Sequence, residues 1–174
     1  MRHAVVTGAS SGIGEAIVKR LLAEGWQVTG LSRRAAMQDT PGFTCLRVDI
    51  TDPDALNGAL NTIATPQAVI HAAGMMAAAP LGQLESRVSA SLWQLHVLAC
   101  EALFNHFAPA MAPGGRLVAI GSRTSRGAAG RSQYVATKAA MVGMVRSWAA
   151  ELAPRGITAN VVAPGATQTP MLSA

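Results

Sequence analysis

The sequence predicts an α/β fold in which a doubly wound parallel sheet carries helices on both faces. Short apolar runs rich in Val, Ile and Leu alternate with longer segments of helical period, which is the pattern of strand–helix–strand units around a parallel sheet. A glycine-rich turn, TGASSGIG, directly follows the first predicted strand and opens a predicted helix. No internal repeat or low-complexity linker interrupts the alternation. We therefore expect a Rossmann-like sheet.

The apolar periodicity predicts six strands and four helices. The strands are expected at residues 3–7, 27–32, 44–48, 68–72, 116–120 and 157–163. The helices are expected at residues 14–24, 53–64, 87–111 and 133–153. Asp52 before Pro53 supplies an N-cap followed by a proline at the first helical position. Residues 33–43 are too few for a full crossover helix and should hold one helical turn or a loop, within the usual right-handed connection.

Length and composition restrict the class of protein. The chain has 174 residues, is half hydrophobic and is 13% charged, which suits a single compact α/β domain over residues 1–174. No apolar run approaches the ~18 residues needed to span a bilayer, and the short apolar stretch near the N-terminus meets a glycine-rich turn rather than continuing as a signal peptide. We expect a soluble cytoplasmic protein without a membrane partner.

Cysteine placement and charge predict neither a metal site nor a nucleic-acid partner. Cys45 and Cys100 lie in apolar segments without metal-ligand spacing, which favours reduced core thiols. Fourteen Lys plus Arg against nine Asp plus Glu give a net charge of +5, a sign compatible with phosphate contacts. The basic residues are spread along the chain, however, and no predicted helix carries a continuous basic stripe.

The glycine-rich turn at residues 7–14 is expected to bind phosphate. Gly8, Gly12 and Gly14 lack a Cβ, so the backbone can approach a pyrophosphate, whose charge the N–H groups and dipole of the helix start would stabilise. The spacing GxxxGxG differs from the GxGxxG of many dinucleotide folds, and a flexible strand-to-helix turn is the alternative. Because strand, glycines and helix stand in the required order, we favour a dinucleotide-binding domain.

Residues at the end of the second strand favour NADP(H), with NAD(H) the less favoured cofactor. About 20 residues beyond the glycines, an acidic residue would bind a ribose 2′-hydroxyl and an arginine would accept a 2′-phosphate. The chain has Ser32, Arg33 and Arg34 there and no carboxylate, and guanidiniums suit bidentate phosphate recognition. Solvated surface arginines are the alternative. Asp49, at the end of the third strand, should either reach the adenine ring or cap the following helix.

Tyr134 and Lys138 form a YxxxK pair one helical turn apart, and such residues share a helix face. A phenol ionises near pH ~10, and a neighbouring cation favours the phenolate, so Tyr134 is a candidate general acid and base. Ser122 is expected at the carboxyl end of the fifth strand, the edge where doubly wound sheets bind ligands. A solvated Tyr–Lys pair and an ordinary turn serine are the alternatives, and Ser125 is the second candidate for the role of Ser122.

Together these motifs resemble the short-chain dehydrogenase/reductase family. The resemblance rests on TGASSGIG at 7–14, HAAG at 71–74 where the family has NNAG, Ser122, Tyr134 with Lys138, and NVVAPGATQTPM at 160–171. The last of these looks like the sixth strand and nicotinamide-binding loop of the family. The match runs from the first strand nearly to the end of the chain.

The resemblance implies an oxidoreductase that interconverts a small carbonyl compound and a secondary alcohol by hydride transfer. Tyr134 would donate or accept the proton, Lys138 would lower the pKa of Tyr134 and hold the nicotinamide ribose, and Ser122 would orient the substrate carbonyl. Hydroxyl groups suit this task because hydride transfer develops negative charge on the carbonyl oxygen. The expected cofactor-binding residues are Gly8, Ser10, Ser11, Gly12, Ile13, Gly14, Ser32, Arg33, Arg34, Asp49, Ile50, Ala72, Ala73, Gly74, Tyr134, Lys138, Pro164, Gly165 and Thr167.

The chain departs from the family pattern at three places. His96 stands where the family has Asn, and it either replaces that Asn in a water-linked proton relay to the lysine or satisfies a local carbonyl. His71 replaces the first Asn of NNAG and is expected to be structural. After Met171 only three residues follow, so we expect the substrate-covering lobe and last strand of the family to be absent and the sixth strand to be an exposed edge. A fragment, an omitted tail and an edge covered by another subunit are the alternatives.

Substrate class and assembly are less closely specified. Arg123, Arg126 and Arg131 lie beside the proposed Ser122 and Tyr134 and favour an anionic substrate, although a solvated loop has the same composition. Two helices that are apolar on more than one face predict a homodimer or homotetramer, while core packing explains much of the same pattern. Two other functions stay open: a dinucleotide-binding sensor or scaffold without turnover, and an epimerase or dehydratase on the same fold.

Overall fold

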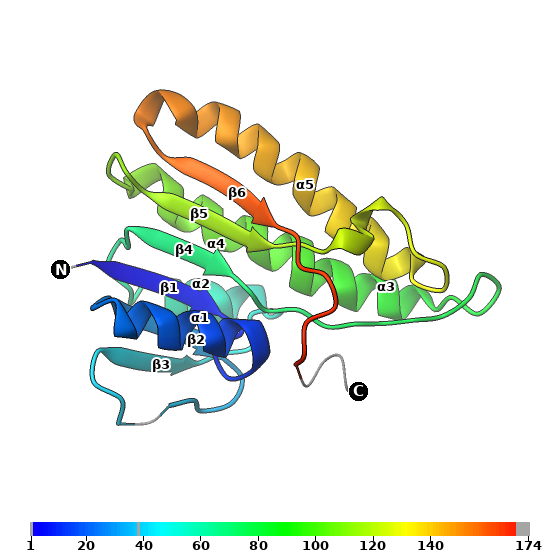
Figure 1. The fold of residues 1–174 in the computed structure, drawn as a ribbon, viewed down its shortest axis with the longest axis horizontal. Helices are drawn as coiled ribbons and strands as arrows, with labels where there is room; N and C mark the ends of the chain where they lie inside the picture. Colours follow the sequence, from blue (N-terminus) through cyan, green and yellow to red (C-terminus); the bar gives the residue numbers. More distant parts are fainter. Residues whose placement is uncertain (1, 38, 170–174) are drawn as a thin grey trace.

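A computed structural model describes residues 2–37 and 39–169 of the chain, and within them all strands belong to one parallel sheet (Figure 1). The strand order is β3-β2-β1-β4-β5-β6, and every neighbouring pair is parallel. The strands are β1 (His3–Thr7), β2 (Gln27–Ser32), β3 (Phe43–Arg47), β4 (Ala68–His71), β5 (Arg116–Ile120) and β6 (Thr158–Val162). The predicted doubly wound sheet is confirmed, and its order reverses between β1 and β4, where such sheets bind ligands.

Helices cover both faces of the sheet. The α-helices of the described residues are α1 (Gly12–Ala23), α2 (Pro53–Leu60), α3 (Ser86–Trp93), α4 (Ala99–Phe107) and α5 (Ser132–Leu152). Short 3₁₀ turns are η2 (Ala108–Ala110), η3 (Arg123–Arg126) and η4 (Ala153–Arg155). Figure 1 shows α1 on one face, with α3, α4 and α5 behind the other. The described part of segment 33–43 forms a loop and no helical turn.

Alternate strand residues feed two apolar cores, as expected for a sheet that is buried on both faces. Val5, Val69 and Leu117 pack with Leu56 and Leu60 of α2 and with residues of α4 and α5. On the opposite face, Ala4, Val6, Val28 and Ile70 pack against Val18 of α1. Because burying each such side chain contributes roughly 1.5–3 kcal/mol, this alternation fixes the strand register. It thereby aligns the carboxyl ends of β1, β4 and β5.

The prediction of one continuous helix over residues 87–111 is wrong, because the helix is interrupted. A π-helix, η1 (Gln94–Leu98), separates α3 from α4. The apolar pattern runs through this region without a break, so periodicity alone could not reveal the wider turn. Such π-turns are rare and often lie at functional sites. The predicted helix over 53–64 also ends earlier, at Leu60.

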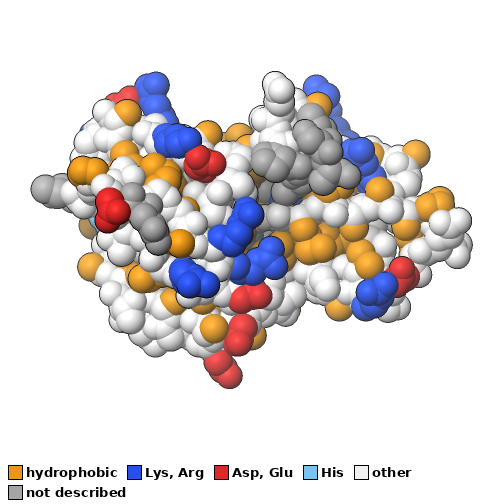
Figure 2. Space-filling view, turned by 90° about the horizontal axis from the view of Figure 1, so that it is seen from below, with side chains coloured by type: hydrophobic (Ala, Val, Ile, Leu, Met, Phe, Trp, Pro, Cys, Tyr) orange, Lys and Arg blue, Asp and Glu red, His pale blue; other side chains and the backbone are white. Residues whose placement is uncertain are grey.

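Other structural findings bear on the sequence predictions. No helix in residues 2–37 and 39–169 has the length and apolarity needed to cross a membrane. Cys100 is fully buried, whereas Cys45 on the edge strand β3 is only half-buried, so the prediction of two core thiols holds for one of them. The face seen in Figure 2 carries basic and acidic side chains intermixed rather than one continuous basic stripe. Strand β6 lies at the edge of the described sheet, and 51% of Val162 is exposed.

Candidate active site

A cleft of about 530 Å³ opens at the carboxyl ends of β1, β4 and β5. It combines the glycine-rich turn, the segment after β4, the π-helix, the start of α5 and the segment after β6. Of the predicted site residues, it is lined by Gly8, Ser11, Gly12, Ile13, Ala72, Ala73, Gly74, His96, Ser122, Tyr134, Lys138, Pro164, Gly165 and Thr167. Residues distant in sequence therefore meet where the strand order reverses, as the motif pattern predicted.

Close backbone contacts explain the glycines of the turn. Gly8 has a φ of +71°, and a Cβ there would lie 2.8 Å from the backbone of Ala73. A Cβ on Gly14 would lie 2.2 Å from the carbonyl oxygen of Gly8. Ser11 is the N-cap of α1, yet its side chain makes no capping hydrogen bond. The turn thus presents the start of a helix to the cleft with little side-chain cover, which suits the phosphates of a dinucleotide.

His71 links the end of β4 to the π-helix. Its Nε2 lies 3.1 Å from the carbonyl oxygen of Leu95, which can only accept, so Nε2 carries the proton. Its Nδ1 therefore accepts from the hydroxyl of Thr7, 3.0 Å away. The Thr7 oxygen in turn accepts the N–H groups of Ala72 and Ala73, each at 3.1 Å. Burial, with a smaller effect of the Lys138 charge, lowers the pKa of His71 to about 3, so the ring is neutral.

His96 is also buried, and both of its ring nitrogens have partners. The N–H of Met75 donates to Nε2 at 3.1 Å, so the proton lies on Nδ1, which donates to the hydroxyl of Thr137 at 2.8 Å. The Thr137 hydroxyl in turn donates a hydrogen bond to the carbonyl oxygen of Tyr134 at 2.9 Å. Burial, then the charge of Lys138, lowers the pKa of His96 to about 2.

The geometry of His96 therefore differs from the local-carbonyl alternative. The ring satisfies a backbone N–H and a hydroxyl rather than a local carbonyl. Within the described residues, His96 makes no direct hydrogen bond to Lys138, and a water-linked relay to the lysine stays a prediction. The ring instead meets Tyr134 edge-on, with centroids 5.5 Å apart. His96 thus supports the helix that carries Tyr134.

Tyr134 and Lys138 are buried on the first two turns of α5, with 6% and 4% of their surface exposed. The Lys138 Nζ donates to the carbonyl oxygen of Ile120 at 2.8 Å and lies 5.8 Å from the centroid of the Tyr134 ring. Burial lowers the pKa of Lys138 to about 8. The alternative of a solvent-exposed Tyr–Lys pair is therefore excluded.

The expected lowering of the Tyr134 pKa by Lys138 is not what the structure shows. Burial raises the pKa of Tyr134, because the anion would lose hydration, and the opposing effects come from Ser122 and Arg131. Tyr134 is consequently protonated at neutral pH. This is the state in which a phenol can donate a proton.

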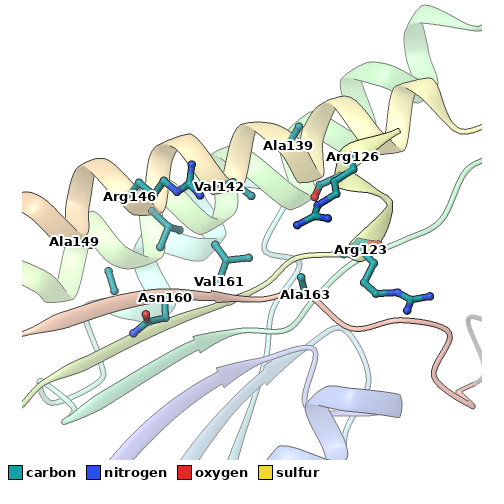
Figure 3. A pocket seen from close by; sticks show the side chains of 13 residues that line it. Arg123, Arg126, Ala139, Val142, Arg146, Ala149, Asn160, Val161 and Ala163 are labelled. Atoms are coloured by element: carbon teal, nitrogen blue, oxygen red, sulfur yellow. The ribbon is translucent and has the colours of Figure 1, made fainter. Parts of the chain in front are cut away.

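Ser122 follows β5 and caps the short helix η3. Its Oγ accepts the N–H of Thr124 at 3.2 Å and pairs with the Thr124 hydroxyl at 2.8 Å. Ser125 lines a different space, a groove of about 990 Å³ between α5 and β6 (Figure 3). Of the two serine candidates, only Ser122 lines the cleft with Tyr134.

The predicted residues for the adenosine end lie away from the lining of the cleft. Arg33 and Arg34 are exposed after β2. Asp49 accepts from the N–H and hydroxyl of Thr51, whereas Asp52 caps α2, so the capping alternative for Asp49 is wrong. Thr51 has the larger effect in lowering the pKa of Asp49, but Arg33 also contributes.

Four further predicted cofactor residues differ in their placement. Ile50 is buried in the core formed with α2 rather than in the cleft. The Ser32 hydroxyl donates to the carbonyl oxygen of Arg34 at 2.5 Å. Ser10 and Gly14 belong to the glycine-rich turn without lining the cleft. A carboxylate, Asp49 after the neighbouring strand β3, does lie close enough to Arg33 for the charge of Arg33 to help lower its pKa.

Sequence reasoning missed the threonines that support the site. Thr7 precedes the first glycine, Thr137 stands inside the YxxxK motif, and Thr124 lies two residues after Ser122. Each could have been noticed only from its position beside a motif residue. The hydroxyls of Thr7 and Thr137 join segments as far as 66 and 41 residues apart, and a linear pattern does not reveal such contacts.

Comparison with known proteins identifies the family. A family model described as short chain dehydrogenase matches residues 2–174. The chain belongs to the short-chain dehydrogenase family. It is thus an oxidoreductase by family, with the sheet, glycine-rich turn and Tyr–Lys pair expected from the resemblance.

Individual short-chain dehydrogenases and related proteins align over nearly the whole chain. The 3-oxoacyl-(acyl-carrier-protein) reductase MabA of Mycobacterium bovis is 32% identical over 180 residues, covering 99% of this chain and 72% of MabA. A short chain dehydrogenase from Burkholderia cenocepacia, solved in complex with NADP, is 31% identical with a TM-score of 0.88, covering 98% and 76%. A family protein from Francisella tularensis has a TM-score of 0.94 at 23% identity, covering 99% and 72%, and shows the same fold.

Proposed function

We propose that the chain is an NADP(H)-dependent dehydrogenase or reductase that interconverts a small carbonyl compound and a secondary alcohol. One observation carries the proposal: Ser122, Tyr134 and Lys138 line the same cleft as the glycine-rich turn. A hydroxyl donor, a buried cation and a phosphate cradle are thereby brought together at one sheet edge. Membership of the short-chain dehydrogenase family supports the same reaction class.

The residues present fit a dinucleotide. The close approaches at Gly8 and Gly14 leave no room for a Cβ, and the first turn of α1 would hold the pyrophosphate. Ala72, Ala73 and Gly74 would flank the bound cofactor, and Pro164, Gly165 and Thr167 would lie against its nicotinamide. We propose that residues 1–174 act as one dinucleotide-binding domain.

NADP(H) is the proposed cofactor because of Arg33 and Arg34. Both guanidiniums are exposed immediately after β2, where they could form a bidentate contact with a 2′-phosphate. Asp49 would share Arg33 with that phosphate, so Arg34 is proposed as the main contact. The NADP complex of the Burkholderia relative is consistent with this preference.

In the reduction direction, the chain's own residues would position and protonate the carbonyl oxygen. When bound, the cofactor supplies the hydride. Ser122 would donate a hydrogen bond that orients the carbonyl, with Thr124 holding the serine oxygen in place. Tyr134, protonated because burial raises its pKa, would transfer its phenolic proton to the substrate oxygen. The ammonium of Lys138 would then stabilise the phenolate that remains.

The proposal is tested by following NADPH oxidation with a panel of carbonyl compounds that includes a 3-oxoacyl thioester. The wild type should turn over at least one compound, whereas Tyr134→Phe should lose on the order of a hundredfold or more in kcat while binding NADPH normally. Tight NADPH binding without turnover of any compound would instead support a sensor or scaffold. Equal rates for both proteins would remove Tyr134 from the mechanism.

We also propose that the chain assembles as a homodimer or homotetramer. Trp93 at the end of α3 and Leu98 at the end of the π-helix are exposed by 42% and 41%. Exposed large apolar side chains that form a patch commonly mark contact surfaces, and these two lie five residues apart along consecutive helices. Light scattering of the purified protein would give the mass directly.

A further inference from the structure

The three arginines beside the cleft line different spaces: Arg131 the cleft, Arg126 the groove between α5 and β6, and Arg123 both. Arg123 and Arg131 line the cleft together with Tyr134 and Lys138. Arg126 lines the groove between α5 and β6, together with Arg146, and Arg123 borders that groove as well as the cleft. Figure 3 shows Arg126 pointing into that groove, whereas Arg123 points the other way, beyond the end of β6.

The cleft carries positive charge without a compensating carboxylate. No Asp or Glu is among the described residues that line it. The ion pairs within residues 2–37 and 39–169 join Lys19 to Glu15, Arg20 to Glu24 and Arg87 to Glu85, so they leave Arg123 and Arg131 without acidic partners. Both imidazoles near the site are neutral. A concave surface with cations of one sign concentrates anions.

Arg131 is placed beside the reacting group. It is the N-cap of α5, three residues before Tyr134, and its charge partly offsets the rise that burial causes in the pKa of Tyr134. Arg123 is held differently. Its backbone N–H donates to the carbonyl oxygen of Pro164 at 3.0 Å, and its guanidinium lies where a Cβ on Gly165 would meet it at 3.0 Å.

From these positions we infer that the carbonyl substrate is itself an anion, with a carboxylate held by Arg131 and by Arg123, which both line the cleft. This inference rests on the proposed function and names its substrate class. A guanidinium can bind a carboxylate through two parallel hydrogen bonds. The pair would thus fix the substrate while leaving its carbonyl beside Ser122 and Tyr134.

The cofactor is a second source of negative charge, and the two sources can be separated. Its pyrophosphate belongs at the start of α1, while Arg131 begins α5. If Arg131 served the cofactor, its loss would change the KM for NADPH. If it serves the substrate, its loss changes the KM for the oxo acid and leaves that for NADPH unaltered.

The test compares 2-oxo, 3-oxo and 4-oxo acids with their methyl esters in the wild type, Arg131→Gln and Arg123→Gln. Arg126→Gln is the matched control, since Arg126 belongs to the same loop but lines the other groove. We expect kcat/KM to be higher for at least one acid than for its ester by on the order of tenfold to a hundredfold, because that factor corresponds to the usual contribution of hydrogen bonds to charged groups. Arg131→Gln should abolish that preference, Arg126→Gln should preserve it, and added salt should weaken it.

Several results would overturn the inference. Equal kcat/KM for every acid and its ester in the wild type would show that no carboxylate is recognised. If Arg131→Gln lowered kcat/KM equally for the acid and its ester, Arg131 would act only through Tyr134. A change confined to the KM for NADPH would assign the guanidinium to the cofactor.

The inference can still be tested if the proposed reaction does not occur. If no carbonyl compound is reduced, calorimetry of the NADPH-bound protein with the same acids and esters still tests the inference. Binding of an acid but not its ester, lost in Arg131→Gln, would support an anion site. Equal or absent binding of both would overturn it.

Discussion

The hydroxyl of Thr137 lies 2.8 Å from Nδ1 of His96 and connects that ring to the carbonyl oxygen of Tyr134. The first contact spans 41 residues of sequence and joins the π-helix to α5. Because the N–H of Met75 occupies the other ring nitrogen, the tautomer is fixed by neighbours rather than by solvent. His96 and Thr137 therefore act as positioning residues for the proposed acid, Tyr134.

Replacement of Thr137 by valine should destabilise the fold. The buried Nδ1–H of His96 would lose its acceptor, and an unsatisfied buried donor costs about 1–3 kcal/mol. Thr137→Ser retains the hydroxyl and is the control for the change in shape. The free energy of unfolding measured in urea decides the matter, and a valine variant as stable as the wild type would show that the hydrogen bond contributes nothing.

Lowering the pH should destabilise the fold at pH values above those at which its carboxylates are protonated. The pKa values of His71 and His96 are lowered to about 3 and about 2 in the folded chain, against about 6.5 when unfolded. The unfolded chain therefore binds more protons below pH ~6.5, and the stability present above that pH is lost as the pH falls. Each histidine should cost about 2 kcal/mol between pH 7 and pH 5.

His96→Asn isolates one part of that pH effect. An amide can both donate and accept but does not titrate in this range, so the variant should lose less stability than the wild type between pH 7 and pH 5. Unfolding curves at the two pH values would show this. If the free energy of unfolding changed equally with pH in the two proteins, His96 would have to bind a proton in the folded state as readily as in the unfolded state.

Substitution of Gly14 by alanine should remove cofactor binding. The added Cβ would lie 2.2 Å from the carbonyl oxygen of Gly8, a backbone atom that cannot move without opening the turn. Gly143→Ala is the matched control, because a Cβ there meets nothing within 4 Å and the helix should gain about 1 kcal/mol. Fluorescence titration with NADPH should show loss of binding only in Gly14→Ala. Normal affinity in that variant would place the phosphates elsewhere.

The strands were the most predictable part of the fold. Apolar runs bounded by glycine or polar residues mark β1, β2 and β5 with the bounds that the structure has. The glycine-rich turn and the YxxxK pair were equally readable, because each needs particular residue types at short spacing. Their meeting in one cleft follows from parallel topology, which aligns the carboxyl ends of the strands.

Features that depend on tertiary contacts could not be predicted. The π-helix leaves no trace in the apolar pattern, and the partners of His96 come from segments 21 and 41 residues away. The pKa of Tyr134 was expected to fall, yet burial raises it, since spacing along a helix gives proximity and not desolvation. The three loop arginines are equivalent in the sequence pattern. The structure distinguishes them, because Arg131 lines the cleft, Arg126 lines the groove between α5 and β6, and Arg123 lines both.

Cofactor preference should depend on Arg34 more than on Arg33. Asp49 lies close enough to Arg33 for that charge to help lower its pKa, so Arg33 already has a nearby anion. Arg34→Gln should reduce the ratio of kcat/KM for NADPH over NADH by about tenfold, as for loss of one charge-assisted contact, with a smaller effect for Arg33→Gln. A ratio near one in the wild type would contradict the preference for NADP(H).

The central claim is hydride transfer to a carbonyl carbon within the cleft of Tyr134. It is tested most directly by mass spectrometry of the product formed from NADPH that carries deuterium at the transferable position of the nicotinamide. We predict one deuterium on the alcohol carbon with the wild type and no labelled product above background with Tyr134→Phe. An altered product without deuterium would contradict the claim and point to an epimerase or dehydratase.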